Sequence, residues 1–212
     1  MNSPMTDTLD RGVAGDPNWN LVPLPADRGG PDLPLLAEAM REFHDLLTGA
    51  DAPPELVKEM LRQVELFNTE LRGHQVPESE QIVGRIDVPG RAQTLIPVLH
   101  IDAKEPDSLG GRVRFGRYYL GRNGAVYGGA IPLLFDSLLG RVSNGGGRNP
   151  ARTAYLHVDY RSVTPIDADL RFEAHLVREE GRKRFIKGSL HHGDTLCAEA
   201  EGLFITLRAG QR

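Results

Sequence analysis

The spacing of hydrophobic residues along the chain changes from a helical to a strand-like period near residue 82. Upstream of that point, apolar residues recur every three or four positions in the segments 36–47 and 56–71. This is the spacing of amphipathic helices. Pro53 suits the start of the second helix, and Gly73 suits its end. We therefore expect a helical hairpin over residues 32–80, which must pack on something else because about 40 residues are too few to fold alone.

Residues 1–31 lack this periodicity and are rich in Pro, Gly, Asp and Asn. Segments of such composition bury too little apolar surface to order themselves. We expect a mobile N-terminal arm, with Trp19 and Leu21 as candidate anchors to the body. The arm also contains acidic residues and no apolar stretch of the secretory type. This favours a cytoplasmic location.

The rest of the chain, residues 81–212, is dominated by strand patterns. Six segments alternate between apolar and polar residues: "QTLIPVLHI", "GRVRFGRYYL", "TAYLHVDYRSV", "ADLRFEAHLV", "RFIKGSLHH" and "TLCAEAEGLFITL". In the third, Leu156, Val158 and Tyr160 share one face. The last four segments are joined by short, turn-rich connections, which predicts an antiparallel meander.

A helical stretch interrupts these strands. "NGAVYGGAIPLLFDSLLG", residues 123–140, contains one charged side chain, Asp136, and predicts a helix from Ala130 to Val142 that is apolar on nearly all sides. One helix with an antiparallel sheet is an α+β arrangement. Because one sheet covers only one side of such a helix, we expect a second copy to cover the other, in a homodimer or a dimer of dimers. A buried carboxylate is costly unless it is paired or used, so Asp136 is a candidate for chemistry.

Composition excludes several functional classes. Lys and Arg total 25 against 29 for Asp and Glu, a net charge of −4, which argues against general nucleic-acid binding. No apolar run approaches the roughly 18 residues of a membrane span. Cys197 is the only cysteine, so the chain has no internal disulfide. The motifs of phosphate-binding loops, dinucleotide folds and serine-nucleophile elbows are absent from the sequence. We expect neither a cofactor nor a metal.

The segment "GRNGAVYGG" and the acid that follows it resemble the hotdog-fold acyl-CoA thioesterases, most closely their PaaI-like branch. The family motif is Asn-x-x-Gly-x-x-His-Gly-Gly with an acid nine residues after the His. Four positions match it: Gly124, Gly128, Gly129 and Asp136. The family's Asn and His correspond to Gly121 and Tyr127. The resemblance covers roughly residues 85–208 and implies an antiparallel sheet wrapped around one long central helix.

The resemblance implies hydrolysis of acyl-CoA to the free acid and CoA. Unpaired N–H groups at Gly128 and Gly129 would bind the oxyanion at the helix N-terminus. Asp136 would act as the general base or as a nucleophile. Seven residues separate Gly129 from Asp136, about 10 Å at roughly 1.5 Å per residue. We therefore expect Asp136 to serve the glycines of a partner subunit.

Other positions are weaker candidates for the same site. Thr153 lies near where the family has a Ser or Thr that orients water or the acid. Tyr127 could donate its phenol to the substrate or fill the space of the missing imidazole, and we favour the second role. Asn123 is a candidate for substrate binding. The phosphates of CoA call for a basic rim, which three consecutive residues of one hairpin turn would supply: Arg182, Lys183 and Arg184.

Two other functions fit a fold of this kind. A non-catalytic hotdog protein that binds acyl-CoA or another apolar ligand is motivated by Gly121 and Tyr127, which replace polar groups of the family motif. A hotdog dehydratase would need an Asp/His pair at the helix entry, which the sequence lacks.

Overall fold

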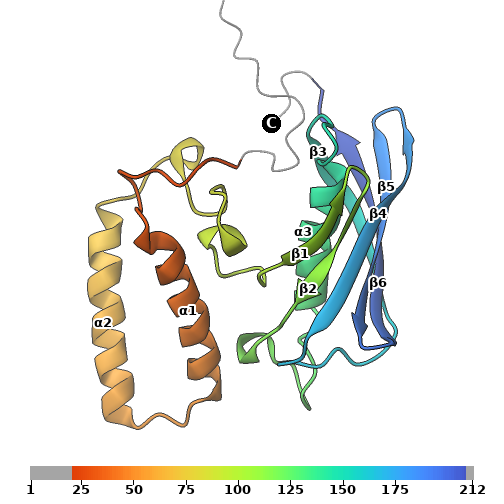
Figure 1. Cartoon of the computed structure of the whole chain (residues 1–212). Helices are drawn as coiled ribbons and strands as arrows, with labels where there is room; N and C mark the ends of the chain where they lie inside the picture. Colours follow the sequence, from red (N-terminus) through yellow and green to blue (C-terminus); the bar gives the residue numbers. More distant parts are fainter. Residues whose placement is uncertain (1–20, 209–212) are drawn as a thin grey trace, which may run out of the picture.

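The computed structural model describes residues 21–208, and its main body is a six-stranded antiparallel sheet curved around one helix (Figure 1). The strands are β1 (His100–Glu105), β2 (Ser108–Val113), β3 (Ala151–Tyr160), β4 (Leu170–Glu180), β5 (Lys183–His192) and β6 (Thr195–Thr206). They lie in the order β1-β2-β4-β5-β6-β3. Helix α3 (Ala130–Ser143) packs on one face of this sheet. The α+β hotdog architecture expected from the sequence is confirmed.

Helix α3 lies very close to the centre of the sheet. Leu134, Phe135 and Leu139 are fully buried against it. The close approach depends on glycine, because a Cβ at Gly188 would lie 3.0 Å from Leu139 Cδ2 and 3.3 Å from Phe135 Cε1. Gly202 is similar, since its Cβ would lie 3.1 Å from Leu139 Cδ1. Glycine at these two strand positions therefore seats the helix and fixes where its other face points.

That other face of α3 is not covered by the sheet. Asp136 is exposed, and Ser137, Gly140 and Arg141 are only partly buried. Residues one, four and five positions apart form one stripe of a helix, opposite the buried leucines. The sequence suggested a buried carboxylate, but in the single chain Asp136 lies on the open side of the helix.

The first strand predicted from the sequence is wrong in its position. β1 begins only at His100, after most of the "QTLIPVLHI" segment. The Oε1 atom of Gln93 accepts the N–H groups of Leu95 at 2.8 Å and Ile96 at 3.2 Å, and Pro97 has no N–H to offer a neighbouring strand. These local hydrogen bonds compete with strand pairing and turn the chain instead.

The second predicted strand is too long. β2 ends at Val113, and Arg117–Tyr119 forms a short 3-10 helix. The cause is a contact from the N-terminal helices, because Asp45 Oδ1 accepts the N–H of Tyr118 at 2.8 Å. Gly116 has no room for a side chain beside the same carboxylate. A tertiary contact thus converts a strand-like sequence into a turn.

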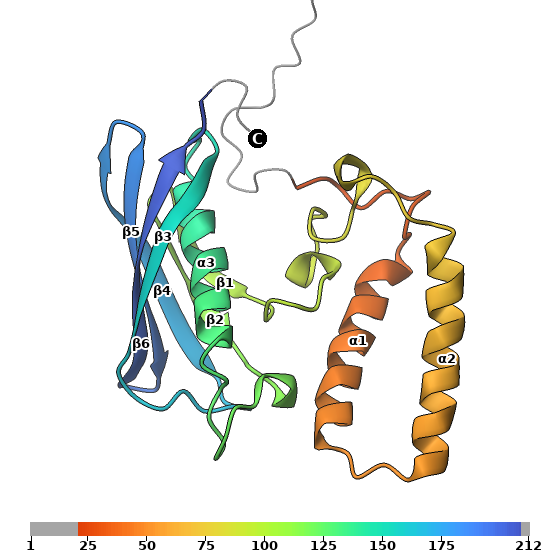
Figure 2. The same ribbon diagram turned by 180° about the vertical axis from the view of Figure 1, so that it is seen from behind.

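The N-terminal helices, α1 (Asp32–Gly49) and α2 (Pro54–Arg72), occur where the periodicity predicted them. In both views α1 lies between α2 and the sheet (Figures 1 and 2). A small cluster of Ala37, Ile86 and Ala92 packs α1 against the segment that precedes the sheet. Helix α2 has no buried residue. Only α1, therefore, docks on the body of this chain.

Most of the N-terminal arm expected from the sequence, including Trp19, lies outside the described residues. Its last part is held by backbone hydrogen bonds: Val22 N–H donates to Arg85 O at 2.7 Å, and Asp87 N–H donates to Val22 O at 3.0 Å. Among residues 21–208, no helix is both long enough and apolar enough to cross a membrane.

Candidate functional site

Asp136 and Thr153 meet in the structure. Asp136 projects from α3, and the Oγ1 of Thr153 on β3 donates to its Oδ1 at 2.9 Å. Beside Thr153, β3 is bulged, because its register against β6 shifts between Thr153 and Tyr155. Bulges re-aim neighbouring side chains and occur often next to active sites. The hydrogen bond holds one carboxylate oxygen, and no residue between 21 and 208 donates a hydrogen bond to the other.

These two residues lie at a cavity of about 260 Å³. Its polar wall also includes Arg91 and Arg141, which come from the segment before β1 and from α3. Its apolar wall includes Ile96, Ala151 and Phe204. A carboxylate at the edge of a part-apolar, part-basic cavity can act on a ligand that has both kinds of surface.

The glycine turn before α3 is held by a tyrosine. The Tyr160 hydroxyl, at the end of β3, donates to Gly128 O at 2.6 Å. Because all peptides of the described residues are trans, the Gly129 N–H points away from the carbonyl that Tyr160 holds. Within residues 21–208, no acceptor contacts the N–H of Gly128 or Gly129. The turn thus presents two unused donors at the helix N-terminus, where the helix dipole adds partial positive charge.

Tyr127 covers this turn. Its ring lies over Gly129, with Cε1 2.7 Å from where a Cβ of that residue would be. The side chain is 64% exposed in the single chain. Its position fits the space-filling role that we favoured from the sequence, and that role stays a prediction.

Asp136 and the glycine turn do not meet within one chain. Gly129 and Asp136 are seven residues apart on one helix, about 10 Å along its axis. Neither Gly128 nor Gly129 lines the cavity beside Asp136. The carbonyl group of one bound ligand therefore cannot contact both Asp136 and the glycine turn of the same chain.

The basic hairpin turn differs from the expectation at one residue. Arg182, in the turn between β4 and β5, and Lys183, the first residue of β5, are exposed, but Arg184 is 3% exposed. Its Nη1 donates to Ser143 O at 2.8 Å and Asn149 O at 2.7 Å, and its Nε donates to Glu179 at 3.0 Å. Arg184 caps the C-terminal end of α3 and is not part of an exposed basic rim.

Asn123 occupies a tight turn. It has a positive φ of 52°, followed by Gly124 at 74°, and Ala125 N–H donates to Arg122 O at 2.9 Å. An Asn-Gly pair is typical of such two-residue turns. This geometry accounts for the residue without a ligand, and its substrate-binding role stays a prediction.

Three residues of this region were missed from the sequence: Tyr160, Arg91 and Arg141. Alternation along β3 puts Tyr160 on the same face as Leu156 and Val158, which could have directed attention to it. No sequence signal links Arg91 to α3, because only folding brings the two together.

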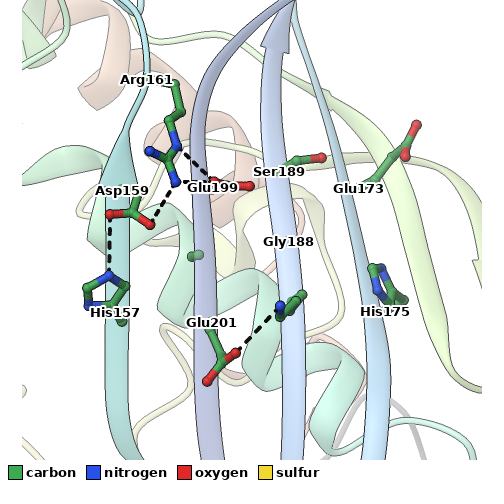
Figure 3. A pocket seen from close by; sticks show the side chains of 11 residues that line it. His157, Asp159, Arg161, Glu173, His175, Gly188, Ser189, Glu199 and Glu201 are labelled. Carbon is green, nitrogen blue, oxygen red and sulfur yellow. Dashed lines mark hydrogen bonds and ion pairs between the residues drawn. The ribbon is translucent and has the colours of Figure 1, made fainter.

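A second hollow, on the outer face of the sheet, is lined by charged side chains (Figure 3). Arg161 pairs with Glu199 at 2.6 Å and with Asp159 at 3.1 Å, and Lys187 pairs with Glu201 at 3.7 Å. The side chains in these pairs are about half exposed to solvent. This face is an ion-pair ladder on the side of the sheet away from α3.

Comparison with known proteins agrees with the fold. No family model matches the chain. The acyl-coenzyme A thioesterase THEM4 of Bos taurus is 33% identical over 94 residues, which is 43% of this chain and 38% of that protein. THEM4 of Mus musculus is 34% identical over 94 residues, 43% of this chain and 40% of that protein. The match thus spans well under half the length of these curated relatives.

A solved structure matches far more of the chain. The crystal structure of a thioesterase superfamily protein is 26% identical and superposes with a TM-score of 0.71 over 82% of this chain and 94% of that one. This overlap extends beyond the sheet and α3. On its architecture, its glycine turn and these similarities, the chain has a hotdog fold and is similar to proteins of the thioesterase superfamily.

Proposed function

We propose that this protein hydrolyses acyl-CoA thioesters to the free acid and CoA. The observation that carries the proposal is the position of Asp136, which Thr153 holds at the edge of a cavity on the open face of α3. The unused N–H groups of the glycine turn and the similarity to THEM4 support it. Assignment to the PaaI-like branch and to the cytoplasm belongs to the proposal and rests on the sequence alone.

The chemistry follows from these groups. Asp136 takes a proton from water as the water oxygen bonds to the thioester carbonyl carbon. The carbonyl oxygen becomes an oxyanion, which the Gly128 and Gly129 N–H groups stabilise. Collapse of the intermediate breaks the C–S bond, and the proton from Asp136 passes to the CoA sulfur. Direct attack by Asp136 would instead form a mixed anhydride, which water then hydrolyses.

The site is shared between two subunits in this proposal. Two α3 helices that run antiparallel across a twofold axis bring Asp136 of one chain to the glycine turn of the other. The open face of α3, with Leu133 only partly buried, supports such a contact. The same arrangement brings Arg182 and Lys183, at the C-terminal end of α3, towards the partner's glycine turn. There they would bind CoA phosphates, with Asn123 as a further candidate contact.

The test is thiol release from short, long and aromatic acyl-CoAs. We expect catalytic turnover of at least one class, with free CoA and free acid produced in equal amounts. An absence of thiol release from every acyl-CoA that binds would contradict the proposal.

That outcome would favour a second candidate function, non-catalytic binding of acyl-CoA or another apolar ligand. Its motivation is specific, because Gly121 and Tyr127 replace the Asn and His of the family motif. Calorimetry with the same acyl-CoAs separates the two functions, since a binding protein retains the thioester intact.

Tyr160→Phe tests the orientation of the glycine turn. Loss of the hydroxyl frees the Gly128 carbonyl, so the Gly129 N–H is aimed less well at the oxyanion. Removing an oxyanion donor costs about 10²–10³ in kcat, and we expect loosening one to cost roughly tenfold with KM little changed. Tyr155→Phe is the matched control, because its hydroxyl donates to Glu201 on the outer face. Equal kinetics for both variants would show that Tyr160 has no positioning role.

A further inference from the structure

Two arginines in the cavity beside Asp136 form no ion pair with any residue between 21 and 208. Arg91 and Arg141 both line this cavity. The Nε atom of each is buried and has no hydrogen-bond partner among the described residues. Guanidinium groups are usually paired when they are taken out of water, because an uncompensated buried charge is strongly unfavourable.

The residues around Arg91 and Arg141 do little to neutralise their positive charges. Burial, and to a smaller extent the nearby charge of Arg91, lower the pKa of Arg141 to about 10, although Asp87 acts in the opposite direction. Burial also lowers the pKa of Arg91, again opposed by Asp87. No ion pair within 4 Å joins Asp87 to either arginine in the part of the chain that is described. Both arginines are protonated at neutral pH, so the cavity carries excess positive charge.

The backbone that carries Arg91 is strained and clamped. Arg91 and Ala92 both have φ of 54°, next to Gly90 at 63°. Non-glycine residues in this region persist only where the surroundings hold them, often at functional sites. Here α1 does so, because Arg41 Nη2 donates to Gln93 O at 2.6 Å, directly after the turn. The N-terminal hairpin thereby helps to hold one wall of the cavity.

The arginines lie a short distance beyond the proposed reaction centre. Asp136 and Arg141 are on the same stripe of α3, five residues apart, which is a rise of about 7.5 Å. The cavity wall between the two polar regions includes Ile96 and Phe204. A thioester carbonyl at Asp136 and an anion at Arg141 would thus be joined by a few methylene groups.

We propose that the Arg91–Arg141 pair binds a carboxylate at the far end of the acyl group, so that the preferred substrates are CoA monothioesters of short dicarboxylic acids. The inference rests on the proposed function and specifies its substrate class. Two guanidinium groups supply several donors to one carboxylate, which is the geometry arginine recognises best. The acyl methylenes contact the apolar wall.

The test compares glutaryl-CoA with pentanoyl-CoA, which have five-carbon acyl groups and differ in ending with a carboxylate or a methyl group. Binding is measured by calorimetry in an Asp136→Asn chain, which suppresses hydrolysis, and kcat/KM is measured in the parent chain. We expect both measurements to favour glutaryl-CoA by about 10- to 100-fold, the range for a hydrogen bond to a charged group.

Arg141→Met should abolish this preference, because it retains side-chain volume and removes the charge. Its melting temperature without ligand should be unchanged or higher, since a partly buried charge without an ion-pair partner among residues 21–208 is removed. Arg141→Lys should retain part of the preference. Arg171→Gln, which removes an exposed arginine paired with Glu173 on the sheet, should retain all of it.

The results distinguish which anion the two arginines bind: the acyl carboxylate, a phosphate of CoA or a carboxylate of a partner subunit. Equal weakening of glutaryl-CoA and pentanoyl-CoA by Arg141→Met would assign the arginines to CoA phosphates and overturn the inference. A smaller assembly by light scattering, with selectivity unchanged, would assign them to a carboxylate of a partner subunit and also overturn it. If no acyl-CoA is hydrolysed, the proposed function fails, but selective binding of glutaryl-CoA still supports the carboxylate site. Absence of selective binding overturns the site whether or not turnover occurs.

Discussion

Asp136→Asn is expected to lower kcat/KM for acyl-CoA hydrolysis by about 10²–10⁴-fold, the usual contribution of a general base. The amide has nearly the same size, and its oxygen can still accept the Thr153 hydroxyl that now contacts Asp136 at 2.9 Å. It cannot take a proton from water or attack a thioester. Because the side chain is exposed in the single chain, the fold should survive. Thiol release and thermal unfolding measure the two effects separately.

Asp194→Asn is the matched control, since Asp194 is an exposed carboxylate in the β5–β6 turn. It should retain parental activity. If Asp136→Asn hydrolyses acyl-CoA as fast as this control, or if it unfolds the protein, the carboxylate is structural.

Complementation tests whether Asp136 acts across subunits. Gly129→Pro removes the N–H donor, and the φ of −71° at this position suits proline. Gly129→Ala is its control, because it adds a Cβ next to Tyr127 but keeps the N–H. In a 1:1 mixture of Asp136→Asn and Gly129→Pro chains, half the dimers are mixed and each has one intact site. We expect about a quarter of parental activity from the mixture if the site is shared, and none beyond the separate variants if each chain acts alone.

Arg184→Met is expected to cost about 3 kcal/mol or more in the free energy of unfolding. The substitution leaves the carbonyls of Ser143 and Asn149 without their donor, in a place where Arg184 is 3% exposed. Glu179 keeps a weaker partner in Arg148 at 3.6 Å. The loss therefore arises mainly at the end of α3, where the guanidinium also stabilises the negative end of the helix dipole. Denaturant unfolding monitored by circular dichroism measures it.

Lys187→Met on the same strand is the comparison. Its ammonium group points to the outer face and contacts Glu201 only at 3.7 Å, so its loss should change the free energy of unfolding by less than about 1 kcal/mol. If the two variants are equally stable, Arg184 does not hold the helix end.

Much of the fold follows from local patterns, and the reason is visible at particular residues. The period of three to four residues placed α1 and α2, and the alternation of polar and apolar residues placed β3 to β6, because each pattern reports which face of an element is buried. The same logic fails at "QTLIPVLHI", where Gln93 caps its own backbone, and at Tyr118, where Asp45 of α1 takes the backbone N–H. Composition does not reveal those hydrogen bonds.

Some residues of the candidate site could likewise be predicted from the sequence, and others could not. The sequence by itself singled out Asp136 as the one charge in an apolar helix, and the resemblance to the hotdog thioesterases singled out Gly128 and Gly129 just before that helix. Thr153 was a weaker prediction that the structure brings to Asp136.

Only the tertiary structure decided the contacts of Arg184 and Tyr160 and the proximity of Arg91 to Arg141. On β5, Arg184 lies on the same face of the sheet as the buried Ile186 and Leu190. Alternation alone does not tell whether an arginine on this face is buried, because that depends on which element packs against it. Here the C-terminal carbonyls of α3 lie against it. Arg91 and Arg141 are 50 residues apart in the chain. They line one cavity only because the chain folds the segment before β1, which Arg41 of α1 holds at Gln93, next to α3. The periodicity of apolar residues indicates which face of each helix or strand is buried. The charge inside a cavity depends instead on which elements come together to form it.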